Sequence, residues 1–299
     1  MLRSRLIATL VLIPSLLGLL WLDVKAPVGP PGFWLCALAM IVSGLACFEL
    51  LDLLQDNIVP APRWPSLIGT ELVVFAAALP ELFEHPNSAS HAVGRGGFVL
   101  LAMILAFLLA VGQEMYCFTG ESRHSTARIG LGMFIVTYAG VLMSFLVAIR
   151  LMLPNVWGAV AIFSILCIIK VSDAGAYFTG KSLGRHKLAP ILSPHKTVEG
   201  LIGGMLAACL ASLLLFLVLV PCWIAGPATI GWLEALLYGA TLAAVGAVGD
   251  LTESLVKRDA RRKDSSGLIP GLGGVLDIVD SVLLTAPVAF LWWASGWYK

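Results

Sequence analysis

The sequence predicts an all-α polytopic membrane protein with about nine transmembrane helices. Three observations predict it: the composition, the spacing of the apolar runs, and the distribution of lysine and arginine. Of the 299 residues, 59% are hydrophobic and 12% are charged, whereas soluble domains carry about 25% charged residues. A soluble core of this size cannot bury so much apolar surface, so the composition favours a membrane protein.

A helix that crosses a bilayer needs about 20 predominantly apolar residues, and nine segments approach this length. They are Leu6–Leu22, Phe33–Leu54, Pro65–Leu82, Gly97–Val111, Ile129–Leu153, Val156–Ile169, Leu201–Ile224, Ile230–Val248 and Val275–Trp293. The first resembles a signal peptide, but no small-x-small cleavage site follows it, so we expect an uncleaved helix. The sixth is short, and the polar stretch after it can still be helical.

Two parts of the chain differ in their loops. Residues 1–153 hold about five transmembrane helices with short loops of ordinary composition. Residues 154–299 form the predicted catalytic transmembrane region, with two polar segments at 170–200 and 249–274 that are rich in charge, glycine and proline. We therefore place the chemistry in the second part.

The basic residues predict the orientation of the helices. With the N-terminus in the cytoplasm and nine spans, 15 of the 19 lysines and arginines fall on the cytoplasmic side and four on the outer side. This split follows the positive-inside rule and predicts a multi-pass protein of a bacterial-type inner (plasma) membrane, with its C-terminus outside. The net charge of +1 gives no reason to expect a nucleic acid partner. The six scattered cysteines form no CxxC pair, so they indicate neither a metal knuckle nor a disulfide framework.

The first polar segment predicts a phosphate site. Ser193 followed by Pro194 is typical of a helix start, with a serine cap and a proline in the first turn. A helix N-terminus presents free N–H groups that suit a phosphate, and Lys196 would add a full charge there. The alternative is a solvated basic loop that only obeys topology.

The second polar segment carries acids next to basic residues. Asp250, Ser254 and Lys257 are spaced i, i+4 and i+7, so they share one helix face, and Asp277 and Asp280 are spaced i, i+3. Carboxylates within a membrane are usually functional, and hard oxygen ligands beside phosphates favour Mg²⁺. The sequence thus predicts a metal site of Asp250, Asp277 and Asp280, although Asp277 and Asp280 alone could simply be acids in a first helical turn.

Acids in the N-terminal part are weaker candidates. Glu49 and Asp52 lie at the end of the second apolar run, and Glu71 lies within the third. Acids at helix ends are common, so we assign these three no role from the sequence.

The two polar segments resemble the signature of the phosphatidate cytidylyltransferases, also called CDP-diacylglycerol synthases. The resemblance covers about the last 130 residues. It is carried by Ser172-Asp173-x-Gly175-Ala176-Tyr177, by Ser193-Pro194-x-Lys196-Thr197-x-x-Gly200, and by Ser254-x-Val256-Lys257-Arg258-x4-Lys263-Asp264-x-Ser266-x2-Ile269-Pro270-x-x-Gly273-Gly274-Val275-x-Asp277-x-x-Asp280.

The resemblance implies a nine-helix intramembrane enzyme, usually a homodimer, with a cytoplasm-facing polar cavity in its C-terminal half. It also implies that the enzyme uses Mg²⁺ with K⁺ beside it. By position, Asp250 and Asp277 match the family's metal-site carboxylates, and Lys196 and Lys257 match its substrate-handling lysines; we expect these four to be catalytic. The residues expected to bind substrate are Asp173, Ser193, Thr197, Ser254, Arg258, Lys263, Asp264, Gly273 and Gly274. The chain departs from the pattern at Leu272, where the family has histidine, and at Ile278, where it has arginine.

The implied reaction transfers CMP from CTP to phosphatidate, giving CDP-diacylglycerol and pyrophosphate within the lipid bilayer. A CTP-dependent lipid kinase would use similar parts. A transporter would also place acids in its helices, but it would need polar residues through the full membrane depth. The departures at Leu272 and Ile278 leave an inactive paralogue as a further alternative.

Overall fold

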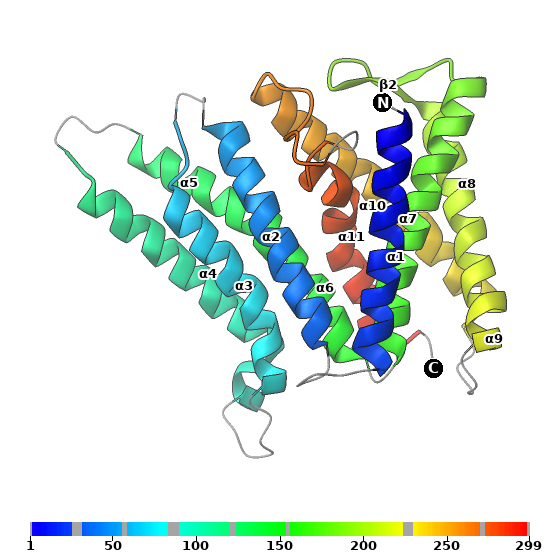
Figure 1. The fold of residues 1–299 in the computed structure, drawn as a ribbon, viewed down its shortest axis with the longest axis horizontal. Coiled ribbons are helices and arrows are strands. Elements are labelled where there is room, and N and C mark those ends of the chain that lie inside the picture. The colour runs from blue at the N-terminus through cyan, green and yellow to red at the C-terminus, as the bar shows by residue number, and fades with distance from the viewer. Residues whose placement is uncertain are drawn as a thin grey trace. The chain divides into compact units, whose positions relative to one another are not determined.

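The computed structural model describes residues 2–25, 32–55, 59–82, 90–119, 124–153, 156–223, 230–269 and 273–297, and most of them are helical (Figure 1). Within these ranges the chain forms nine rods, where a rod is one continuous helical segment that can contain more than one labelled helix. The predicted fold class and helix count are therefore confirmed. The rods are α1 (Leu2–Lys25), α2 (Phe33–Leu54), α3 (Arg63–Leu82), α4 (Ser90–Tyr116), the continuous α5 (Ser125–Ile135), η1 (Val136–Val141) and α6 (Leu142–Met152), α7 (Val156–Leu183), the continuous α8 (Val198–Leu214), η2 (Leu215–Leu219) and α9 (Val220–Trp223), α10 (Trp232–Asp259) and α11 (Leu276–Ala294). Seven are long and apolar enough to cross a membrane, and α1 and α3 complete the set.

Two helices extend well beyond their apolar runs. The sequence places the ends of these runs at Ile169 and Val248, but α7 continues to Leu183 and α10 to Asp259. The polar residues that follow each run continue the helix because intrahelical hydrogen bonds satisfy their backbone groups. Asp173 and Asp250 therefore lie on helices, in agreement with the helix face predicted for Asp250, Ser254 and Lys257.

The predicted helix start at Ser193 is wrong. Strand β1 (Lys187–Ala189) pairs antiparallel with strand β2 (Ser193–Thr197), with Ala189 opposite Ser193 and Lys187 opposite Thr197. Helix α8 begins at Val198, and its cap is Thr197, whose side chain accepts a hydrogen bond of 3.1 Å from the Gly200 N–H. The hairpin provides backbone partners for this stretch, and Pro194 is tolerated because a two-stranded sheet has only edge strands.

Residues group into two compact units. Unit 1 comprises Met1–Ala159 and Asp259–Val279, and unit 2 comprises Val160–Arg258 and Asp280–Lys299. In unit 1, the buried Val73 and Ala76 of α3 pack with Ala102 and Ala106 of α4 and with Val136 of η1. Small side chains allow helices to approach closely in a membrane, where packing rather than the hydrophobic effect drives association.

In unit 2, a glycine brings α10 against α11. A Cβ atom added to Gly249 would lie 2.9 Å from both the Asp280 carbonyl oxygen and the Ser281 Cα atom. Only glycine fits this approach without a shift of one helix. The same approach brings the neighbouring Asp250 towards Asp280.

Candidate functional site

A cavity of about 520 Å³ lies in unit 2, within the C-terminal half of the chain for which the family resemblance implies a polar cavity. Its charged and polar lining residues include Asp173, Lys181, His195, Lys196, Thr197 and Asp250. Apolar and small residues complete the lining, among them Ile169, Leu201, Gly204, Ala243 and Gly246. The cavity therefore offers both charge for phosphates and apolar surface for a lipid.

Two of the predicted site residues meet at this cavity. The Lys196 ammonium lies 2.6 Å from an Asp250 carboxylate oxygen, although Lys196 lies on β2 and Asp250 on α10. Asp173 on α7 accepts a longer hydrogen bond, of 3.4 Å, from the Lys170 ammonium. The Asp173 and Asp250 side chains keep 50% and 39% of their surface exposed, so both can be reached by a ligand.

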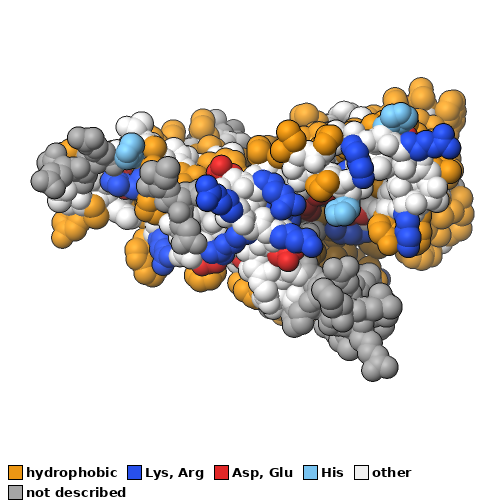
Figure 2. Space-filling view, turned by 90° about the horizontal axis from the view of Figure 1, so that it is seen from above, with side chains coloured by type: hydrophobic (Ala, Val, Ile, Leu, Met, Phe, Trp, Pro, Cys, Tyr) orange, Lys and Arg blue, Asp and Glu red, His pale blue; other side chains and the backbone are white. Residues whose placement is uncertain are grey.

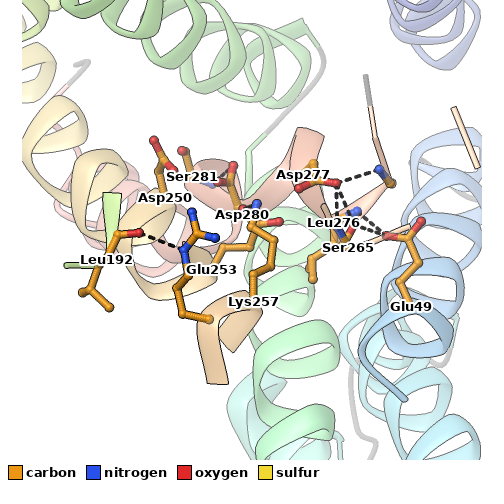
Figure 3. A network of polar contacts seen from close by, with 12 residues as sticks. Glu49, Leu192, Asp250, Glu253, Lys257, Ser265, Leu276, Asp277, Asp280 and Ser281 are labelled. Atoms are coloured by element: carbon orange, nitrogen blue, oxygen red, sulfur yellow. Dashed lines mark hydrogen bonds and ion pairs between the residues drawn. The ribbon is translucent and has the colours of Figure 1, made fainter. Parts of the chain in front are cut away.

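Three acids cluster between α10 and α11 (Figure 3). One carboxylate oxygen from each of Asp250, Glu253 and Asp280 lies within 4.8 Å of the other two. Glu253 and Asp280 are buried, at 2% and 6% exposure, and Lys257 pairs with Glu253 at 2.6 Å. The predicted convergence of Asp250 and Asp280 is thus present, with Glu253 as a third member that the sequence analysis did not assign.

The donor set of this cluster fits a hard divalent cation. Mg²⁺ prefers carboxylate oxygens and keeps several water ligands. Clustered carboxylates repel one another unless positive charge lies between them, and Lys196 and Lys257 compensate two of the three acids. Asp250, Asp280 and Glu253 are therefore the described residues that could hold the metal.

Asp277 has a different environment, within unit 1. One of its carboxylate oxygens accepts hydrogen bonds from the Gly274 N–H at 2.7 Å, from the Ser265 hydroxyl at 2.8 Å and from the Ser265 N–H at 3.1 Å. Asp277 is not a member of the three-acid group found among the described residues. Its role as a metal ligand remains a prediction, and its described contacts order the loop before α11.

The remaining predicted substrate-binding residues are distributed over both units. In unit 2, Arg258 donates from Nε to the Leu192 carbonyl at 3.3 Å, which ties the end of α10 to the β1–β2 hairpin. Ser193 and Ser254 are half-buried on β2 and α10.

In unit 1, Lys263 and Asp264 are exposed on the loop. Gly273 has a φ of 94°, which favours glycine, and exchanges two hydrogen bonds with Ile269. Ile278 is half-buried on α11, whereas Leu272 lies outside the described residues.

Two of the acids that contact the polar segments were not predicted from the sequence. Glu253 carried a readable signal, because it lies three residues after Asp250 and four before Lys257, on their helix face. Glu199 follows the Thr197 cap and accepts hydrogen bonds from the Arg185 and His186 N–H groups. Glu49, weighed only as a weak candidate, lies on a different helix, and nothing local to it indicates its partner.

Fold and site together define an intramembrane protein whose acids and lysines surround a cavity suited to phosphates. The Cytidylyltransferase family matches residues 3–295, and the chain belongs to this family. The chain is 34% identical over 313 aligned residues to the phosphatidate cytidylyltransferase of Pseudomonas aeruginosa, with 99% of each chain covered. It is 31% identical to the phosphatidate cytidylyltransferase of Bacillus subtilis, with 83% of this chain and 84% of that protein covered. It is also 36% identical to the uncharacterized protein YnbB of Escherichia coli, a match that spans 64% of this chain and 62% of that protein.

Proposed function

We infer that this chain is a phosphatidate cytidylyltransferase, which transfers CMP from CTP to phosphatidate and releases pyrophosphate. Its relatives at 34% and 31% identity carry this name. The observation that carries the inference is the cavity in unit 2, because it combines the Lys196–Asp250 pair with small and apolar lining residues. The phosphates of a nucleoside triphosphate need the positive charge of the lysine, and the acyl chains of a diacyl lipid need the apolar surface.

The reaction needs positioning and charge neutralisation more than proton transfer. A phosphate oxygen of phosphatidate attacks the α-phosphorus of CTP, the bond from that phosphorus to the bridging oxygen breaks, and pyrophosphate leaves. Because the attacking phosphate is already ionised, no side chain has to remove a proton. Lys196 and Lys257 hold phosphate oxygens in line for attack, and such positioning supplies a large part of the barrier reduction.

We propose that Mg²⁺ binds at Asp250 and Asp280, with Glu253 in the same cluster and Asp277 as the family-implied further ligand. When bound, the ion neutralises the triphosphate and the leaving pyrophosphate. A K⁺ ion beside it and a homodimer are the remaining expectations from the family. The three-acid cluster supports the divalent site, because buried carboxylates this close together favour a bound cation.

We also propose that the cavity faces the cytoplasm and that the N-terminus lies there with it. Figure 2 supports this orientation, because lysine and arginine side chains are numerous on the face that it shows. Cysteines introduced at Ser4 and Ser295 would be labelled from opposite sides of the membrane. Labelling of both from one side would contradict the odd number of spans.

The fate of separately labelled CTP tests the reaction. Purified protein in detergent, given phosphatidate and Mg²⁺, is expected to incorporate the α-phosphate and the cytosine into lipid while the γ-phosphate leaves in pyrophosphate. Transfer of the γ-phosphate to lipid would establish a CTP-dependent kinase instead. A well-folded protein that binds CTP but forms no labelled lipid would establish an inactive paralogue, in which Leu272 and Ile278 have replaced needed polar groups.

A further inference from the structure

One buried acid in unit 1 has no role in the chemistry proposed above. Glu49 lies near the end of α2 and is 1% exposed. A buried carboxylate is costly unless hydrogen bonds or cations compensate it. Among the described residues, the donors that compensate it lie in the loop before α11 and at the first residue of that helix, more than 200 residues later in the chain.

Both oxygens of the Glu49 carboxylate accept hydrogen bonds from this segment. Figure 3 draws those that one of the two oxygens accepts from Leu276 and Ser265. One oxygen lies 2.8 Å from the Val275 nitrogen and 2.7 Å from the Ser266 hydroxyl. The other lies 2.9 Å from the Leu276 nitrogen and 3.0 Å from the Ser265 hydroxyl. A carboxylate has about four lone-pair directions, and four donor groups face them, of which the Ser265 hydroxyl is shared with Asp277.

These contacts fix the start of α11. Leu276 is the first residue of the helix, and the first N–H groups of a helix have no partner within the helix. Glu49 accepts from the Leu276 N–H, and its negative charge also lies where the helix dipole favours it. The helix thus begins at a point set by α2.

The neighbouring contacts tie the same loop to Asp277. The Ser265 hydroxyl lies within hydrogen-bond distance of both Glu49 and Asp277, and its single proton can be donated to either carboxylate. A Cβ atom added to Gly274 would collide with the Glu49 carboxylate and the Ser265 hydroxyl. Only glycine at this position lets the carboxylate reach the backbone, and the Gly274 N–H itself donates to Asp277.

A second acid on α2 contacts the same loop from a more exposed position. Asp52 lies three residues after Glu49, on the same helix face, and pairs with Arg262 at 2.9 Å. The two side chains are 44% and 35% exposed, so this contact is weaker than the buried one. The end of α2 therefore holds the loop at both of its described parts, residues 260–269 and 273–275.

We propose that Glu49 is a positioning residue for cytidylyl transfer, which holds the loop before α11 and thereby fixes Asp277. The proposal rests on the proposed function for the reaction that it serves. Among the described residues, Glu49 is a member neither of the cavity lining nor of the three-acid cluster, so we assign it a role through the loop.

The substitution Glu49→Gln tests this proposal sharply. Each carboxylate oxygen faces one backbone N–H, so whichever oxygen becomes the amide NH₂ group would point a donor at a donor. We expect kcat/KM for CTP to fall about 10-fold to 100-fold, the range that a small misplacement of catalytic groups produces. Glu71→Gln is the matched control, because Glu71 is a half-buried acid of the same unit whose described hydrogen bond is to Ser43.

A second measurement reports on the loop without activity. Limited trypsin digestion of the full-length protein in detergent, read by mass spectrometry, gives the rates of cleavage after Arg261, Arg262 and Lys263. We expect these rates to rise about 10-fold in Glu49→Gln and to match wild type in Glu71→Gln. Ser266→Ala removes one of the four donors but keeps the buried carboxylate. The fall in kcat/KM and the rise in the cleavage rate should therefore both be present in this variant and be smaller than in Glu49→Gln.

The outcomes separate the two proposals. Lost activity with unchanged cleavage, or faster cleavage with wild-type kinetics, overturns the positioning role of Glu49. If Glu49→Gln fails to fold, wild-type kinetics and wild-type cleavage rates in Ser266→Ala also overturn that role. An inactive wild-type protein counts against the proposed function itself; equal cleavage of wild type and Glu49→Gln would then overturn the loop anchor as well.

Discussion

Glu199 and Glu49 each hold one of the two polar segments, but the two carboxylates differ in burial and in sequence separation. Glu199 holds the start of the β1–β2 hairpin from 13 and 14 residues away, and its side chain is 24% exposed. Glu49 holds the loop before α11 from 216 to 227 residues away and is 1% exposed. The difference teaches that the hairpin is a local structure near water, whereas the loop depends on a distant helix.

The largest expected effect tests whether acids in both units are needed for the reaction. Asp250→Asn in unit 2 and Asp277→Asn in unit 1 should each lower kcat at least about 100-fold, since each removes a carboxylate that would hold the Mg²⁺ ion, which would neutralise the phosphates. The measurement is CDP-diacylglycerol formation at saturating Mg²⁺, with thermal unfolding as the control for folding. Near wild-type turnover in either variant would contradict the metal-site assignment.

The comparison of the two carboxylates predicts unequal losses of stability. Glu49→Gln should lower the free energy of unfolding by about 3 kcal/mol, since it leaves a buried donor unsatisfied. Glu199→Gln should cost clearly less, because water replaces the lost contacts. Thermal unfolding in detergent measures both, and equal shifts would show that burial does not distinguish the two anchors.

Close helix packing in unit 2 predicts an intermediate effect. Gly249→Ala places a methyl group 2.9 Å from the Asp280 carbonyl oxygen and the Ser281 Cα atom, so α10 and α11 must separate. We expect a loss of about 1–3 kcal/mol of stability, typical of overpacking, and weaker Mg²⁺ activation because Asp250 and Asp280 move apart. Activation measured over a Mg²⁺ titration should shift to higher concentration; an unchanged midpoint would place the metal elsewhere.

The smallest effect concerns the start of α8. Thr197→Ala should destabilise the protein by about 1 kcal/mol, the usual value for a lost helix cap. Ser193→Ala, at the residue that the sequence analysis took for the cap, should stay within about 0.5 kcal/mol. A larger loss in Ser193→Ala than in Thr197→Ala would favour a helix start at Ser193 over the hairpin.

Most of the fold could be predicted because a bilayer demands long apolar runs, and these runs are visible without knowledge of tertiary contacts. The same signal ends where polarity begins, so the sequence did not give the true ends of α7 and α10. Ser193-Pro194 satisfied the local rules for a helix start, yet pairing with Ala189 made the segment a strand. Local rules are overridden when a neighbouring segment offers backbone partners.

The site was predicted only in part, for a similar reason. Asp250 and Asp280 stood out as acids at the ends of apolar runs, and the structure brings them together. Glu253 could have been found from its spacing to Asp250 and Lys257. Glu49 could not have been assigned, because its four donors lie in a segment more than 200 residues away.

The central claim is that this chain joins CTP to phosphatidate, and the products of one reaction test it most directly. Purified wild-type protein with CTP, phosphatidate and Mg²⁺ should release one pyrophosphate for each CDP-diacylglycerol formed, as measured by mass spectrometry of the lipid and a coupled pyrophosphate assay. Omission of either substrate, or the Asp250→Asn substitution, should abolish both products together. Pyrophosphate release without CDP-diacylglycerol, or no product from folded protein that binds CTP, would contradict the account.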